Sequence, residues 1–192
     1  MSDGARILVV AATARELAPS DGWVTLVCGV GPVEAAAATA GAIAALRPAA
    51  ILHVGIAGAR RHRALAPASL VIGDESRYCD LDIPAEWSPR SIRASPMLVA
   101  AAQRALPAAV TLVIGTSARV GGTTGCDVEA MEGFGVLRAA QLAGVPAIEV
   151  RAISNDIEEA DRARWHFDAA FAALASATPV LVAELRRAIT DA

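Results

Sequence analysis

Short apolar runs separated by helix-like stretches recur along the whole chain. Runs dominated by aliphatic residues cover residues 6–12, 24–28, 51–56, 70–78, 110–115 and 147–153. A run of this kind, bounded by turn residues, is typical of a strand in a parallel sheet, buried on both faces. The stretches between them predict helices over residues 33–46, 97–105, 132–143 and about 168–190, with Pro179 as a potential break in the last one.

The alternation of strands and helices predicts the fold class. It favours an α/β fold of three layers (αβα), with a mostly parallel, mixed central sheet flanked by helices. Residues 1–192 are expected to form a single domain, because the length suits one core and no linker, repeat or low-complexity segment interrupts it. Residues 79–96 contain three prolines and are predicted as a loop, and Thr116–Gly125 is predicted as a second loop, lying over the functional site.

Composition and charge limit the cellular compartment and the kinds of partner that we expect for this chain. A net charge of −3 argues against a nucleic-acid partner, because no basic stripe could neutralise a row of phosphates. The three cysteines, Cys28, Cys79 and Cys126, are widely spaced and give neither a metal-ligand motif nor a disulfide framework. The apolar run over residues 35–46 is too short to cross a membrane and predicts a buried helix. We therefore expect a cytoplasmic protein without an export signal, a metal or a membrane partner.

Residues 126–155 bring polar side chains to one edge of the predicted sheet. An acidic turn over residues 127–132 precedes a helix, and the strand that follows this helix ends in Ser154 and Asn155. The helix dipole favours the charge of Glu132 at the helix N-terminus. Asn155 lies at the carboxyl end of a strand, where open α/β sheets bind their ligands. A carboxylate and an amide are therefore expected at the same rim.

This stretch resembles the nucleoside phosphorylase and nucleosidase superfamily. The resemblance rests on the pair Met131-Glu132 and on the run Arg151–Asn155. The amino-acid sequence around both is most similar to that of the futalosine hydrolases of menaquinone synthesis. Residues 161–165 fit the same branch, and the similarity is strongest over residues 126–174. The resemblance implies a nucleoside phosphorylase-like fold. It also implies hydrolysis of the N-ribosyl bond of a purine nucleoside, with no cofactor.

The resemblance also implies roles for individual residues. Glu16, four residues beyond the first strand, would orient and deprotonate the attacking water; the alternative is an ordinary surface acid. Met131 and Glu132 would hold the ribose, and Asn155 would bind the leaving purine. The remaining substrate contacts would come from Ala57, Gly58, Ala130 and Ser154.

Asn155 carries a physical argument about the base. Adenine-specific relatives keep an aspartate at this position, whereas an amide offers two N–H donors besides its acceptor. A 6-oxopurine presents acceptors at N7 and O6, so an asparagine can donate to that edge and an ionised aspartate cannot. The substitution points to hypoxanthine, the base of futalosine. The alternative is a strand-end asparagine that caps the next turn.

Other interpretations remain open. Within the superfamily they are a nucleosidase for 5′-methylthioadenosine or S-adenosylhomocysteine and a purine nucleoside phosphorylase; outside it, a nucleoside-binding protein without turnover. The turn Gly29–Glu34 lacks the third glycine of a dinucleotide-binding loop, which favours a tight strand–helix turn.

The far end of the substrate is less defined. Futalosine carries a benzoate carboxylate there, and the arginines that could meet it are Arg60, Arg61, Arg63, Arg77 and Arg119. The loop Thr116–Gly125 lacks the aromatic residue that stacks on the base in many relatives. Relatives also imply at least a homodimer, with the pocket near the interface.

Overall fold

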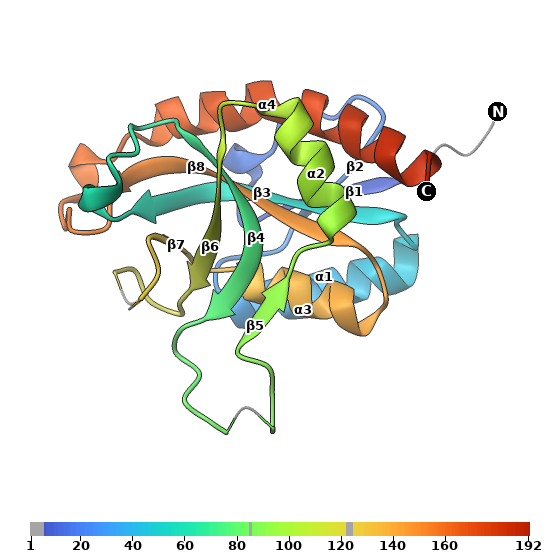
Figure 1. Cartoon of the computed structure of the whole chain (residues 1–192), viewed down its shortest axis with the longest axis horizontal. Coiled ribbons are helices and arrows are strands. Elements are labelled where there is room, and N and C mark those ends of the chain that lie inside the picture. The colour runs from blue at the N-terminus through green and yellow to red at the C-terminus, as the bar shows by residue number, and fades with distance from the viewer. Residues whose placement is uncertain (1–5, 85, 122–124) are drawn as a thin grey trace.

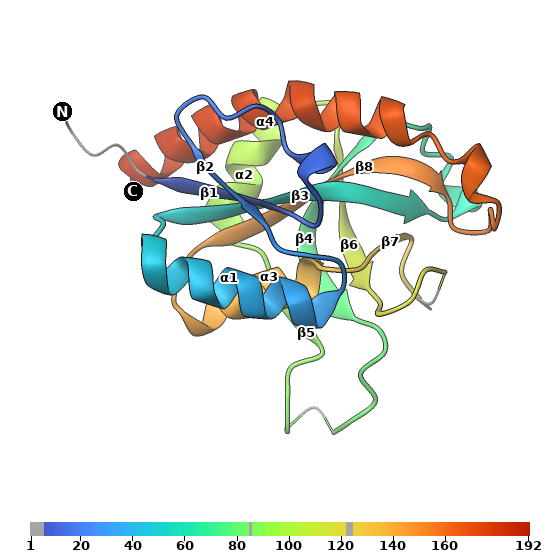
Figure 2. The same cartoon turned by 180° about the vertical axis from the view of Figure 1, so that it is seen from behind.

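In the computed structural model, one eight-stranded mixed sheet lies between two layers of helices (Figures 1 and 2). The structure describes residues 6–84, 86–121 and 125–192. The strands are β1 (Ile7–Ala11), β2 (Val24–Val27), β3 (Ala50–Ala59), β4 (Leu70–Tyr78), β5 (Ser91–Arg93), β6 (Val110–Thr116), β7 (Val128–Ala130) and β8 (Ala147–Asp156). The helices are α1 (Pro32–Leu46), α2 (Pro96–Ala105), α3 (Gly133–Leu142) and α4 (Phe167–Thr190). The α2 and α4 helices cover one face and α1 and α3 the other, which confirms the predicted α/β class.

Five strands of the sheet, including β8, pair in a closed ring. The β8 strand lies between β3 and β4, parallel to β3 and antiparallel to β4. From β4 the pairing continues through β6 to β7, and β7 pairs with β3 in antiparallel orientation. These five strands form a ring, and β1 and β2 extend it from β3 as parallel neighbours. Most pairings are parallel, as predicted, but the alternation of strands and helices gives no sign of the closure.

Burial follows the apolar pattern closely. Every residue of β1 is buried, as expected for a strand covered on both faces. The α3 helix approaches α1 so tightly that a Cβ at Gly135 would lie 2.3 Å from the carbonyl oxygen of Pro32. The predicted burial of α1 is only partly correct, because it buries one face, including Ala35 and Ile43, and leaves Val33 74% exposed.

Several predicted boundaries were wrong where neighbouring strands supply backbone partners. The segment predicted as a loop over residues 79–96 contains β5, which pairs with β4. The turn predicted over residues 127–132 contains β7, which bridges β3 and β6. The β3 and β8 strands run on to Ala59 and Asp156, beyond their predicted apolar runs, and Asn155 is the second-to-last residue of β8, at the carboxyl end as predicted. Paired strands therefore form part of the rim that bears the site.

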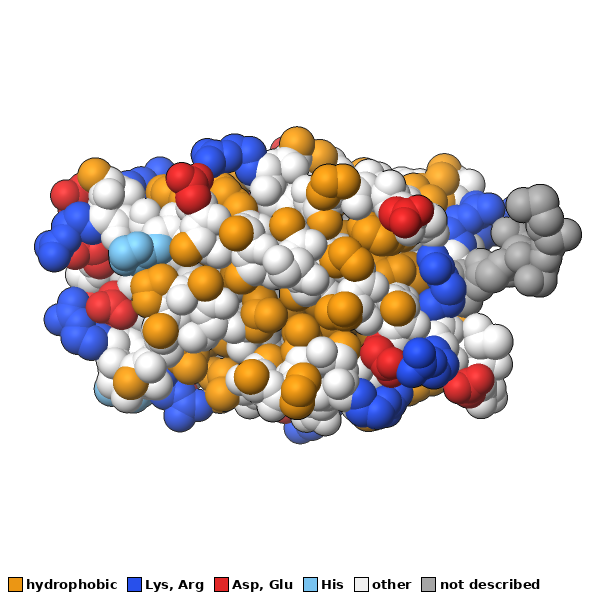
Figure 3. Space-filling view, turned by 90° about the horizontal axis from the view of Figure 1, so that it is seen from above, with side chains coloured by type: hydrophobic (Ala, Val, Ile, Leu, Met, Phe, Trp, Pro, Cys, Tyr) orange, Lys and Arg blue, Asp and Glu red, His pale blue; other side chains and the backbone are white. Residues whose placement is uncertain are grey.

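The α4 helix is continuous through Pro179, so the potential break does not occur. A proline inside a helix removes one backbone hydrogen bond and costs about 3 kcal/mol. The buried row Leu174, Leu181 and Leu185 anchors α4 on the sheet and offsets this cost. By length and composition, α4 could also cross a membrane. Its buried face is that of a core helix, and in Figure 3 the outer surface over α4 mixes apolar side chains with charged ones, mainly towards its ends.

Candidate active site

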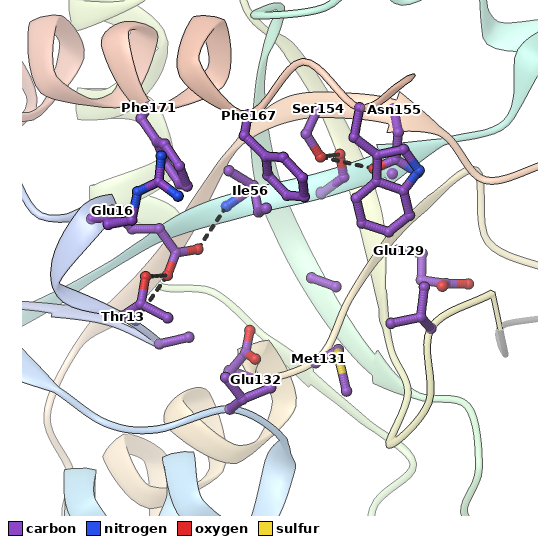
Figure 4. A pocket seen from close by; sticks show the side chains of 18 of the residues that line it. Thr13, Glu16, Ile56, Glu129, Met131, Glu132, Ser154, Asn155, Phe167 and Phe171 are labelled. Atoms are coloured by element: carbon purple, nitrogen blue, oxygen red, sulfur yellow. Dashed lines mark hydrogen bonds between the residues drawn. The ribbon is translucent and has the colours of Figure 1, made fainter. Parts of the chain in front are cut away.

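A pocket of about 330 Å³ opens at the carboxyl ends of β3 and β8, a volume suited to a small ligand (Figure 4). It is closed by β7, by the first turns of α4 and by the 3₁₀ helix Ala14–Glu16 that follows β1. All of the residues predicted to contact substrate line it: Glu16, Ala57, Gly58, Ala130, Met131, Glu132, Ser154 and Asn155. Parts of the chain that are far apart in sequence therefore meet at one site.

Glu16 is held by three donors although it lies at the pocket wall. Its Oε2 atom accepts hydrogen bonds from the backbone N–H (2.8 Å) and the hydroxyl (2.9 Å) of Thr13. Its Oε1 atom accepts from the backbone N–H of Ile56 at 3.1 Å. An ionised carboxylate offers about four acceptor positions, so one position on Oε1 remains. Glu16 is only 5% exposed, so its surroundings and these three donors hold the carboxylate in one orientation.

Glu132 lies opposite Glu16, at the residue before α3 (Figure 4). Its Oε1 atom accepts from the backbone N–H of Gly31 at 3.2 Å, and its Oε2 atom lies 3.3 Å from Nη1 of Arg151. Gly31 has a φ of 97°, a conformation that favours glycine. The tight turn over Gly29–Glu34 thus contacts the carboxylate directly. Burial raises the pKa of Glu132 above its usual value, while Arg151 opposes this shift.

A buried charged network supports Glu132 from behind. Arg151 is completely buried and donates to Oε1 of Glu149 at 2.7 Å. Its Nη2 atom lies 2.6 Å from Nε2 of His53, whose Nδ1 lies 3.0 Å from the carbonyl oxygen of Val10. Burial, together with Arg151, lowers the pKa of His53 well below 6.5, so the ring is neutral and accepts from Arg151. Burial alone would lower the pKa of Arg151, but Glu149 and Glu132 raise it, so the guanidinium stays charged.

Asn155 presents its amide nitrogen as a donor. Its Oδ1 atom accepts from the hydroxyl of Ser154 at 2.8 Å, which orients the amide. Its Nδ2 atom donates to the carbonyl oxygen of Asp156 at 2.8 Å, leaving one N–H for a ligand. In this conformation Asn155 can therefore give a base one hydrogen bond, whereas the sequence argument assumed two.

An aromatic wall that the sequence analysis did not assign lines the same pocket. It consists of Trp165, Phe167 and Phe171, at the start of α4 and just before it. The ring centroids of Trp165 and Phe167 are 5.5 Å apart, and those of Phe167 and Phe171 are 6.2 Å apart. The loop Thr116–Gly125 has no aromatic residue, but three aromatic residues on or just before α4 line the pocket. The position of Trp165 in the motif at residues 161–165 was the available signal.

The five arginines considered for the far end of the substrate lie outside the pocket lining. Four of them pair with carboxylates elsewhere: Arg60 with Glu158, Arg61 with Asp156, Arg63 with Asp127 and Arg77 with Glu75. The side chain of Arg119 is exposed. Among the residues that the structure describes, Arg15 is the only lysine or arginine in the lining, and sequence reasoning missed it.

The loop predicted to cover the site does reach it. Val120 and Gly121 line the pocket, together with the neighbouring Glu129. Residues 122–124 of this loop lie outside the described part of the chain. Across the described ranges, no group of three or more histidine, cysteine or acidic side chains is arranged to hold a metal ion.

Comparison with known proteins agrees with this geometry. Residues 20–187 match the family described as the phosphorylase superfamily. The chain is 37% identical over 182 residues to futalosine hydrolase of Streptomyces coelicolor, an alignment that covers 82% of this chain and 77% of that protein.

Solved structures show the same fold. The native futalosine hydrolase of Helicobacter pylori superposes with a TM-score of 0.81 at 19% identity, covering 94% of this chain and 98% of that one. A 5′-methylthioadenosine/S-adenosylhomocysteine nucleosidase of Neisseria meningitidis, in complex with methylthio-immucillin-A, gives 0.79 at 21% identity with the same coverages. The chain therefore belongs to the phosphorylase superfamily, and its sequence places it among the futalosine hydrolases.

Proposed function

We propose that this chain hydrolyses the N-ribosyl bond of futalosine, releasing hypoxanthine and dehypoxanthine futalosine in menaquinone biosynthesis. Its relationship to futalosine hydrolase supports an N-glycosyl hydrolase. One observation in the structure carries the proposal: Glu16, Glu132 and Asn155, from three different elements, face one pocket. This is the set of groups needed to activate water, hold a sugar and stabilise a leaving purine.

Glu16 has the role of general base. The free acceptor position on Oε1 would hold a water molecule over the anomeric carbon of a ribose placed between Glu16 and Glu132. The carboxylate would take a proton from this water as the C–O bond forms. Such a contribution is worth about 10²–10⁴ in rate.

Glu132 and Met131 have the role of ribose ligands. The remaining acceptor positions of Glu132 suit the sugar hydroxyls, and Met131 offers an apolar surface to the ring. As the N-ribosyl bond breaks, positive charge develops on the sugar, and hydrogen bonds to its hydroxyls strengthen in such a transition state. Negative charge flows to the purine at the same time. The free N–H of Asn155 would donate to that base, stabilising the charge where it develops.

A nucleosidase for 5′-methylthioadenosine or S-adenosylhomocysteine is the second candidate. The observation in its favour is the likeness of the fold to solved nucleosidases of that name. Asn155 argues against it, because its one free N–H would face the 6-amino group of adenine, another donor. A buried mismatch of this kind costs about 1–3 kcal/mol.

The decisive experiment is an activity panel. Purified protein is incubated with futalosine, inosine and 5′-methylthioadenosine, each with and without phosphate, and the free base and the sugar product are quantified. We expect hypoxanthine from futalosine at a rate independent of phosphate. Ribose 1-phosphate as product would indicate a phosphorylase, preferred release of adenine would indicate the second candidate, and binding without turnover would indicate a nucleoside-binding protein.

We further propose that residues 1–192 act as one nucleosidase domain in a cytoplasmic homo-oligomer, at least a dimer. The joint packing of all described elements on one sheet supports the single domain. Three free cysteines are in keeping with a reducing compartment. The exposed Trp87, in the loop between β4 and β5, and the half-exposed Val120, which lines the pocket, would suit an interface. Light scattering coupled to size-exclusion chromatography measures the oligomeric state directly.

A further inference from the structure

The charged residues that line the pocket are acidic apart from one. Three carboxylates line it, those of Glu16, Glu129 and Glu132, and each belongs to a residue that is less than a tenth exposed. Arg151 offsets part of this charge from behind but does not line the cavity. In the described part of the chain, Arg15 alone brings a positive side chain to the lining. An anionic substituent could therefore enter this pocket at low energetic cost only beside Arg15.

Arg15 stands at one end of the aromatic wall. Its guanidinium carbon lies 4.7 Å from the centroid of the Phe171 ring, and its Nη2 atom lies 3.2 Å from Oδ1 of Asp168. The Asp168 side chain is 96% exposed and that of Arg15 is 69% exposed, so this ion pair is weak and its carboxylate is exchangeable. The stacking on Phe171 fixes the plane of the guanidinium and leaves donors for a second carboxylate.

The aromatic wall also indicates the direction in which a bound nucleoside would lie in the pocket. In Figure 4, Phe171 lies above Glu16, Asn155 lies on the opposite side, and Phe167 lies between them. A nucleoside with its base at Asn155 and its anomeric carbon near Glu16 would extend the other side of its ribose along Phe167 towards Phe171. The end of that path is the guanidinium of Arg15.

We propose that Arg15, with Phe167 and Phe171, forms a specificity subsite for an aromatic substituent that ends in a carboxylate. The rings would pack against the aromatic group, and the carboxylate would replace Asp168 as partner of Arg15. The inference rests on the proposed function, because it takes futalosine, whose far end is a benzoate, as the substrate. It assigns to Arg15 the role that the sequence had left among five other arginines.

The experiment compares two nucleosides that share a base and differ in the tail. The ratio of kcat/KM for futalosine to kcat/KM for inosine is measured in wild type, in Arg15→Met and in Asp168→Asn. Arg15→Met keeps an apolar side chain on Phe171 but removes the charge, and we expect the ratio to fall about tenfold, mainly through KM for futalosine. Asp168→Asn removes the competing carboxylate from a fully exposed position, and we expect the ratio to stay the same or rise severalfold.

The outcomes separate this inference from the proposed function. A ratio that moves less than twofold in Arg15→Met, or falls in Asp168→Asn as far as in Arg15→Met, would overturn the subsite. Salt dependence gives a test that needs no variant. Added salt should weaken wild-type activity on futalosine more than on its carboxamide analogue, because salt screens the carboxylate from Arg15. Equal salt sensitivity of the two activities would also overturn the subsite. A wild type that releases hypoxanthine from neither futalosine nor inosine would instead refute the proposed function.

Discussion

Arg151→Met tests the buried network behind the site. Arg151 is completely buried, 2.7 Å from Glu149 and 3.3 Å from Glu132, so its loss leaves two buried carboxylates without their cation. Breaking a buried pair in this way costs about 3–5 kcal/mol. Against a total stability of about 5–15 kcal/mol, the variant should still fold. A protein of this size loses about 2–4 °C of Tm per kcal/mol, so the expected drop is roughly 6–20 °C.

The deficit should depend on pH with a definite sign. Burial holds the pKa of Glu132 above its usual value of 4.5, and Arg151 counteracts this, so removing Arg151 raises that pKa further. A carboxyl whose pKa is raised in the folded state destabilises the fold above its unfolded pKa. This effect disappears as the pH falls towards 4.5. The stability difference between wild type and Arg151→Met should therefore shrink between pH 7 and pH 5.

Urea unfolding of wild type and variant at both pH values measures these effects. The matched control is Arg187→Met, which changes an arginine that is 65% exposed and paired with Glu184, and which should cost less than about 0.5 kcal/mol. If Arg151→Met lies within about 1 kcal/mol of wild type, or if its deficit does not change with pH, the network does not stabilise the fold by charge pairing.

Four further predictions address the chemistry. Glu16→Gln should lower kcat about 10²–10⁴-fold while substrate still binds, because an amide cannot take a proton from water; near-full activity would remove Glu16 from the mechanism. Asn155→Asp should move the kcat/KM ratio of futalosine to its 6-amino analogue about 10–100-fold towards the amino compound, and an unmoved ratio would contradict the argument on the base. Because burial raises the pKa of Glu132, the acidic limb of the kcat/KM profile should lie above pH 4.5, and a limb at or below that pH would count against Glu132 as the titrating ribose ligand. The sulfur atoms of Cys79 and Cys126 are 3.9 Å apart, and the hydrogen bond from Cys79 lowers the pKa of Cys126 to about 7. The two-electron oxidant diamide should therefore join them in a disulfide. Thiol titration should show a loss of two thiols, and an unchanged count would refute this prediction.

The sheet and the polar ends of its strands were the parts most open to prediction. The β1 and β4 strands match their apolar runs within a residue or two, because side chains such as Val9 and Ile72 are fully buried in the finished sheet. Glu132 and Asn155 could be proposed because each lies at or near the end of an element, where parallel sheets collect ligands. The short β7 strand could not be predicted from the sequence, because its partners come from β3 and β6 and its own three residues show no hydrophobic pattern.

The aromatic wall and Arg15 escaped prediction for a different reason. Phe167 and Phe171 are four residues apart on a helix, a spacing that is typical of core packing. Arg15 has the sequence context of a solvated surface residue. Only the approach of the 3₁₀ helix to α4, which brings Arg15 against Asp168 across 153 positions, turns these side chains into one wall.

The position of β8 between β3 and β4 has a consequence for biosynthesis. It is the last of the described strands in chain order, yet it fills the gap between β3 and β4, and 97 positions separate Ser154 from its partner Ala57 on β3. At about 5–20 residues per second, the ribosome needs roughly 5–20 s to supply the missing strand. For the part of that time after β4 has been made, the nascent chain holds the edges of β3 and β4 without their partner β8, which favours aggregation. Truncated chains that end before Ala147 should therefore be insoluble, and the native pocket forms only after β8 and the start of α4 have been made.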